Sequence, residues 1–201
     1  MTLFLDPWYA SGWSDTTGEP DRRWLSPREA RVAYEARGGP YLWVIDGSYP
    51  VGERAVRARW RIELGPGRVQ VGWLDEHGSV LRESRYDRID GRLFRVRVAD
   101  WVYADDRRRW LMYQALLTRT LSIDPDGTTT VIHRRPGDPG FERDVVTIDD
   151  PSALWMDVPE FGRWEGLLNP EHGLPEDPLT DPRLVDEWGL PPRQSASLGV
   201  R

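Results

Sequence analysis

Apolar and polar residues alternate with a period of two over most of the chain between residues 41 and 148. In AVRARWRIEL, residues 55–64, the apolar residues from Val56 to Leu64 occupy one parity, while three arginines and a glutamate occupy the other. This alternation is typical of a β-strand with one buried and one polar face. The same criterion predicts strands over 41–46, 55–64, 68–74, 79–89, 92–104, 109–123, 128–135 and 141–148.

Short turn motifs separate these segments, among them GPG, DG, DPDG and PGDPG. Connections this short join antiparallel neighbours, because parallel strands need a crossover of about a dozen residues or more. The sequence therefore predicts a mainly β fold, an antiparallel meander that forms an up-and-down barrel or a strongly curved sheet. A two-sheet sandwich is the alternative, and segment 109–123 could be partly helical.

One helix is predicted ahead of the strands, over about residues 27–37. Ser26 suits the N-cap and Pro27 suits the first helical position. Glu29 follows Ser26 by three residues, which is the spacing of a capping box, and Gly38 is a suitable C-terminal stop. With this helix, residues 1–150 form the predicted β-rich domain.

The composition changes after residue 150. Residues 151–190 are rich in proline and acidic residues, yet they keep several aromatic side chains. We expect this extension to pack on the domain and residues 191–201 to form a flexible tail. Aromatic residues are also common energetic anchors at interfaces. The predicted contacts with a protein partner are therefore Trp155, Phe161, Trp164 and Trp188.

Several kinds of chemistry are excluded or disfavoured by composition. The chain has no cysteine, and all 27 basic residues are arginine, so thiolate sites and lysine Schiff bases are excluded. Three scattered histidines and no recognisable catalytic motif predict no metal, no cofactor and no assigned catalytic residue. No apolar run reaches the roughly 20 residues of a membrane span, and the N-terminus lacks a basic signal region. We therefore expect a soluble, cytoplasmic bacterial protein that does not bind membranes.

Charge is distributed unevenly along the chain. Residues 53–109 contain 14 arginines and 10 acidic residues, whereas residues 136–201 contain 5 arginines and 14 acidic residues. An acidic C-terminal region would compete with phosphate groups for the arginines. The sequence therefore does not favour nucleic acid as a partner.

Hairpin geometry predicts which side chains face the core. The GPG link pairs Leu64 with Val69 and so brings Trp60 opposite Trp73 on one apolar face. Glu63 and the arginine row then lie on the other face, which we expect to face water. That row consists of Arg57, Arg59 and Arg61.

The next hairpin brings charged residues inward. Asp90-Gly91 is typical of a two-residue type I′ turn and pairs Ile89 with Arg92. An unbroken register then places Phe94 and Val98 on the same face as the odd-numbered residues of the preceding strand. The charged residues on this face, and on the matching parity of the following strand, are the predicted ligand-binding residues. They are Glu83, Arg85, Asp87, Asp100 and Arg119.

Three function classes fit these features. The first is a non-catalytic protein-binding module of the inhibitor or immunity type, favoured by the acidic aromatic extension and the lack of catalytic motifs. The second is a small-ligand-binding β-barrel lined by the five charged residues. The third is a barrel-type cyclase or isomerase that uses buried carboxylates, such as Glu83 with Asp100, or Asp87 with Arg119.

Overall fold

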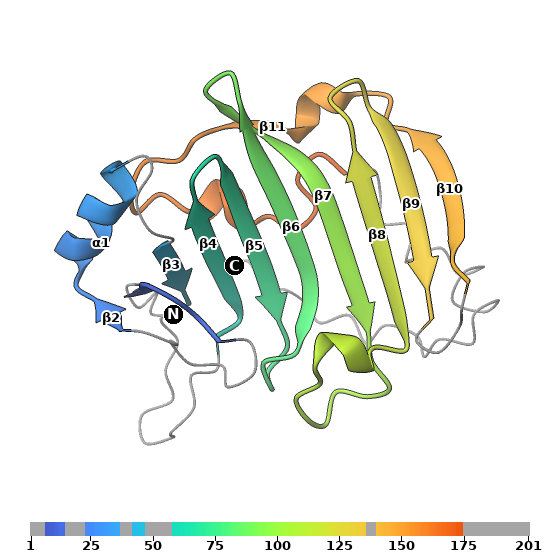
Figure 1. Ribbon diagram of the computed structural model, residues 1–201, viewed down its shortest axis with the longest axis horizontal. Helices are drawn as coiled ribbons and strands as arrows, with labels where there is room; N and C mark the ends of the chain where they lie inside the picture. Colours follow the sequence, from blue (N-terminus) through green and yellow to red (C-terminus); the bar gives the residue numbers. More distant parts are fainter. Residues whose placement is uncertain (1–6, 15–22, 37–41, 47–57, 136–139, 175–201) are drawn as a thin grey trace, which may run out of the picture.

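A single antiparallel sheet organises the computed structural model, which describes residues 7–14, 23–36, 42–46, 58–135 and 140–174. Its 11 strands follow the order β10-β9-β8-β7-β6-β5-β4-β3-β1-β2, with β11 paired to β7 (Figure 1). The mainly β class, the antiparallel meander and the N-terminal helix are confirmed. Among the described strands, β2 and β10 end the strand order without pairing to each other, so the sheet is open rather than a closed barrel. The open sheet is strongly curved.

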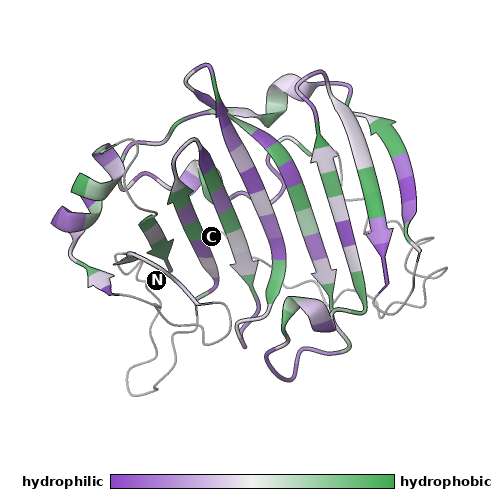
Figure 2. Cartoon of the chain, viewed as in Figure 1, coloured by the Kyte–Doolittle hydropathy of each residue, from purple (hydrophilic) through white to green (hydrophobic). Residues whose placement is uncertain are grey.

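The long strands lie close to where the alternation predicts them, and Figure 2 shows polar and apolar bands along them. They are β3 (Leu42–Ile45), β4 (Trp60–Gly65), β5 (Arg68–Leu74), β6 (Val80–Ile89), β7 (Arg92–Val102), β8 (Leu117–Ile123), β9 (Thr128–Arg134) and β10 (Glu142–Thr147). Segment 109–123 is a strand only in its second half, because η1 (Met112–Gln114) precedes β8.

The remaining elements are short. The strands β1 (Trp8–Ala10), β2 (Trp24–Leu25) and β11 (Trp155–Asp157) contain too few residues for a period to be read. Two further short helices, η2 (Pro151–Leu154) and η3 (Glu165–Leu168), lie in the C-terminal part. None of these was predicted from the sequence.

Helix α1 (Pro27–Glu35) begins with the predicted capping box. The Glu29 amide donates to the Ser26 hydroxyl at 3.3 Å, and the Ser26 amide donates to the Glu29 carboxylate at 2.9 Å. The hydrogen bond from the Ser26 backbone is the largest cause that lowers the pKa of Glu29 to about 2. Gly38, the predicted stop, lies outside the described residues.

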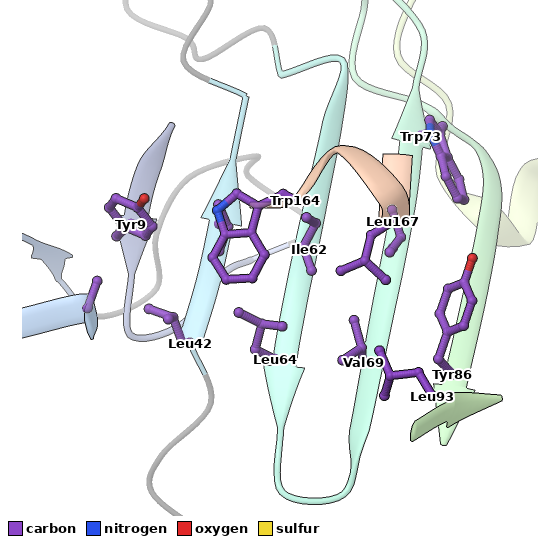
Figure 3. Close-up of a cluster of buried hydrophobic side chains, with 13 residues drawn as sticks. Tyr9, Leu42, Ile62, Leu64, Val69, Trp73, Tyr86, Leu93, Trp164 and Leu167 are labelled. Carbon is purple, nitrogen blue, oxygen red and sulfur yellow. The ribbon is translucent and has the colours of Figure 1, made fainter. Parts of the chain in front are cut away.

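The pairing predicted for the β4–β5 hairpin is confirmed. Trp60 lies opposite Trp73, and Ile62 lies opposite Val71. Their face of the sheet carries the larger hydrophobic cluster, to which α1 contributes Ala30. Leu167 of η3 and Trp164, the residue before η3, also belong to this cluster (Figure 3). Burial of this face is the main apolar contribution that this part of the sheet makes to folding.

The arginine row does not lie wholly in water. Arg59 fits the expectation, since its partly exposed side chain pairs with Asp46 at 2.9 Å, and Arg57 lies outside the described residues. The prediction is wrong for Arg61, which is only 3% exposed. Its guanidinium lies 5.6 Å from the centre of the Trp43 ring. Opposite it stands Gly72, whose missing side chain leaves room for the arginine.

Residues 155–174, called the C-terminal segment below, pack on the sheet. The first three form β11, where Trp155 pairs with Phe94. Further on, the Tyr34 hydroxyl of α1 donates a hydrogen bond to the Pro159 carbonyl. The segment therefore joins the helix to the middle of the sheet (Figure 1).

Candidate functional site

The β6–β7 hairpin sets the orientation of the candidate site residues. Asp90 and Gly91 have φ angles of 50° and 82°, and Ile89 lies opposite Arg92, as predicted for the two-residue turn. Further along, however, Tyr86 pairs with Arg95 while Arg85 pairs with Arg97. Val96 is therefore an extra residue in β7, a β-bulge that shifts the register of the rest of the strand.

The bulge corrects the predicted orientation of three residues. Asp100 pairs with Arg82, whereas an unbroken register would place it opposite Leu81. The side chains buried along β6 are those of Val80, Arg82, Ser84 and Tyr86. Glu83, Arg85 and Asp87 therefore point to the opposite face, because successive side chains alternate.

The five predicted ligand-binding residues thus separate into two groups. Asp100 and Arg119 are buried, with 1% and 2% of their surface exposed. Arg85 and Asp87 form a partly exposed pair of their own at 2.9 Å, and Glu83 is half-buried on their face. A ligand-binding role remains a prediction for all five.

Ionisable residues occupy five consecutive strands at one level of the sheet. Direct cross-strand pairing connects Arg82 of β6, Asp100 of β7, Arg119 of β8, His133 of β9 and Glu142 of β10. We call these five residues the charged row. Its first three members are buried and its last is exposed, so it runs from the core to the β10 edge.

Asp100 is the centre of the buried part of the row. One of its oxygens, Oδ1, accepts a hydrogen bond from Arg82 Nε at 2.6 Å, and Oδ2 accepts one from Arg119 Nη2 at 2.6 Å. Hydrogen bonds between ionised groups are about twice as strong as those between neutral groups. A buried carboxylate held between two guanidinium groups therefore meets the condition under which buried charges persist.

The same face binds the C-terminal segment through backbone carbonyls. Arg95, which is fully buried, donates to the Pro170 and His172 carbonyls, at 2.6 Å each, and to the Ser84 hydroxyl at 2.5 Å. Arg82 donates to the Pro170 carbonyl at 3.4 Å and forms an ion pair with Glu171. Two buried arginines thus hold the segment on the sheet.

Three polar atoms around Arg95 have no hydrogen-bond partner among the described residues. They are Arg95 Nε, Tyr86 Oη and His172 Nε2, each with almost no exposed surface. Arg95 connects them, since its guanidinium lies 5.8 Å from the centre of the Tyr86 ring and donates to the His172 carbonyl. We call Tyr86, Arg95 and His172 the Arg95 cluster; Figure 3 shows Tyr86 within the larger hydrophobic cluster.

Burial determines the protonation preferences in the Arg95 cluster. Desolvation raises the pKa of Tyr86, so its hydroxyl remains a donor. Desolvation and the charge of Arg95 lower the pKa of His172, which favours the neutral imidazole near neutral pH. The cluster therefore presents two donors, one of them on a guanidinium, beside a neutral imidazole.

Sequence reasoning missed Arg82, Ser84, Tyr86 and Arg95. The available signal was the pair Val80 and Tyr86, an apolar and an aromatic residue that lie on the buried, even-numbered positions of β6. The opposite parity carries Leu81 and Ile89, so the pattern of that strand is ambiguous. Only the position of the bulge resolves the ambiguity.

The predicted partner contacts pack against the rest of the chain. Trp155 lies against Phe94 and Phe161 stacks on Tyr9, with ring centres 4.9 and 5.3 Å apart. Trp164 is buried edge-on to Tyr34. Trp188 lies outside the described residues. Contact with a partner stays a prediction, while the observed role of the first three is to anchor the C-terminal segment.

No group of three or more His, Cys, Asp or Glu side chains suited to a metal ion occurs in the described part of the chain. Among the helices that the structure describes, none is long and apolar enough to cross a membrane. Comparison of the chain with protein-family models, curated proteins and solved structures finds no significant match. The function is therefore inferred from the geometry of the site.

Proposed function

We propose that this protein binds a small molecule carrying one carboxylate, without catalysing a reaction, and that the Arg95 cluster is the binding site. This follows the second of the three function classes, with different residues in the site. The observation that carries the proposal is the pair of buried donors, Arg95 Nε and Tyr86 Oη, left without a partner among the described residues. Buried donors without acceptors are rare in native proteins and call for a bound water, ion or ligand.

The charges around the cluster favour an anion. Three buried guanidinium groups, those of Arg82, Arg95 and Arg119, face two carboxylates, those of Asp100 and Glu171. Of the three, Arg95 forms no ion pair with a described residue, and its guanidinium donates only to neutral carbonyl and hydroxyl oxygens. A carboxylate is opposite in charge to the Arg95 guanidinium, and its oxygens are strong acceptors for N–H and O–H donors.

The hydrogen-bonding capacity of the cluster limits the ligand further. Neutral His172 can accept a hydrogen bond at Nε2, so a ligand hydroxyl or amide N–H would complete the cluster. A small hydroxy acid, such as lactate, offers both groups. Acetate offers the carboxylate alone, so comparing the two isolates the contribution of the hydroxyl.

The arrangement does not favour the cyclase or isomerase alternative. Both oxygens of Asp100 already accept hydrogen bonds from arginines, and guanidinium groups do not act as proton donors or acceptors near neutral pH. Glu83 lies on the other face of the sheet from Asp100. The pairs proposed for acid–base work therefore lack a second titrating group beside the first.

The experiment measures thermal unfolding in sodium lactate and sodium acetate, with sodium chloride at equal ionic strength as the reference. A ligand that binds only the folded state raises Tm. We expect lactate to raise Tm more than acetate does. We also expect native mass spectrometry of the gently purified protein to show a bound small acid.

Two tyrosine variants make the test specific. Tyr86→Phe removes a hydroxyl that has no partner among the described residues, so the ligand-free protein should keep its Tm while its affinity for lactate falls about tenfold or more. Tyr103→Phe is the matched control, because the Tyr103 hydroxyl donates to the Val80 carbonyl at 2.9 Å. It should lower Tm and leave the lactate response intact. No carboxylate effect in the wild type, or an equal effect in Tyr86→Phe, would mean that water fills the site.

A further inference from the structure

Strand β10 is the long exposed edge of the sheet. It pairs with β9 over six consecutive residue pairs without a bulge, and its six residues are all exposed. No described strand pairs with its other side. The opposite edge, β2, has only two residues. An edge strand of this length is a template for pairing with a further strand.

The apolar residues of β10 are the ones left in water. Val145 is 62% exposed, and Val146 and Phe141 beside it are also exposed. Natural edge strands are usually protected by a proline, a lysine, a bulge or a cover. The half of β10 from Val145 to Thr147 has none of these among the described residues, whereas the first half carries Glu142, Arg143 and Asp144.

We propose that β10 pairs antiparallel with β10 of a second copy of this chain, with Val145 on the two-fold axis. The inference is independent of the Arg95 cluster. A two-fold dimer is the commonest oligomer, and its interface joins a surface patch to itself. The charges of β10 then decide which registers are permitted.

Each two-fold register places one residue opposite its own copy, and residues of equal parity meet across the axis. An axis at Arg143 opposes two arginines and brings Glu142 against Asp144. An axis at Asp144 opposes two aspartates. Like charges directly opposite one another destabilise strand pairing. Both registers are therefore disfavoured.

Between residues of β10, the valine-centred registers avoid every like-charge pair. With the axis at Val145, the two valines meet, Asp144 lies opposite Val146, and Arg143 lies opposite Thr147. Five residues of each β10 then pair, from 143 to 147. With the axis at Val146 only residues 145–147 of β10 meet within the strands, so the Val145 register gives the longer ladder. In it, the exposed Val145 side chains bury each other.

Sedimentation equilibrium across micromolar concentrations tests the association. We expect the wild type to change from monomer to dimer as concentration rises. Val145→Asp places two carboxylates opposite each other and should keep the protein monomeric at the highest concentration. Val145→Thr, which adds no charge and retains β propensity, should still dimerise. A wild type that stays monomeric, or a Val145→Asp protein that still dimerises, would overturn the proposal.

The absence of cysteine from the sequence allows a direct test of the register. In the proposed dimer Val145→Cys brings two thiols together at the axis, so mild oxidation should convert it to a disulfide-linked dimer. Arg143→Cys, at an exposed position of the same strand, should remain unlinked because its opposite residue is Thr147. Cross-linking of Val146→Cys in preference to Val145→Cys would refute the Val145 register. Circular dichroism checks that each variant is folded.

Discussion

Asp100 is the residue on which the buried charges of the sheet depend. It accepts hydrogen bonds from Arg82 and Arg119 inside the core, where an uncompensated charge is costly. The surface pair Arg85–Asp87 has a similar donor–acceptor distance but is partly exposed. Exposed ion pairs contribute little, because water already solvates both groups.

The two aspartates should therefore differ in how much each one stabilises the fold. Asp100→Asn should lower the free energy of unfolding by about 3–5 kcal/mol, since two buried guanidinium groups would then face a neutral amide. Asp87→Asn should lower it by less than about 1 kcal/mol. Urea denaturation of the two variants measures both values. Equal effects would show that the β6–β7 register described above is incorrect.

The β6–β7 hairpin is the element that places Asp100. Its turn requires positive φ at Asp90 and Gly91, and the bulge at Val96 then offsets the rest of β7. Glycine adopts positive φ without a steric penalty, whereas other L-residues pay about 1–2 kcal/mol. The turn sequence therefore contributes to the register as well as to the reversal of the chain.

Gly91→Ala should consequently destabilise the protein by about 1–2 kcal/mol. A Cβ at this position meets no atom within 4 Å, so the loss would arise from the backbone alone. Gly166 is the matched control. It also has open space around a Cβ, and its φ is not in the positive range, so Gly166→Ala should have little effect. Chemical denaturation of the two variants tests the difference.

Across the whole molecule, the C-terminal segment joins parts of the chain that are distant in sequence. Trp164 packs with Tyr34 of α1 and belongs to the larger hydrophobic cluster, and Trp73 of β5 donates to the Leu168 carbonyl at 3.4 Å. Arg82 and Arg95 hold the residues that follow. The segment therefore covers the main apolar cluster and the Arg95 cluster together.

Trp164→Ala should lower the free energy of unfolding by about 3–5 kcal/mol, the usual cost of removing a large buried aromatic side chain. The substitution should also make the C-terminal segment more sensitive to limited proteolysis than the rest of the chain. The reason is that Trp164 is one of the side chains that attach this segment to the hydrophobic cluster. Trp24→Ala, at a partly exposed tryptophan on the edge strand β2, should have a smaller effect. Uniform proteolysis of the Trp164→Ala protein would contradict a specific anchoring role.

Local patterns in the sequence determined much of the architecture. Alternation and turn motifs predicted the strands from β4 to β10, the β4–β5 pairing, the type I′ turn and the capped helix. These features depend on residues that are neighbours in the chain or directly opposite in a hairpin, so short-range rules suffice. Short-range rules could not decide whether the C-terminal aromatic residues contact the same chain or a protein partner. Both kinds of packing use the same residue types.

Only the tertiary structure decided which charges are buried. Because of a single extra residue in β7, Asp100 and Val98 share a face with Arg82 and Ser84 and not with Glu83. A shift of one residue reverses the direction of the side chains beyond it. Arg61 became buried because Gly72 and Trp43, brought beside it by strand pairing, provide space and an aromatic surface. Arg95 lies in the core because its acceptors come from the C-terminal segment, more than 70 residues away in sequence. Contacts of this kind depend on how separate elements meet in space, which the periodicity of one strand does not determine.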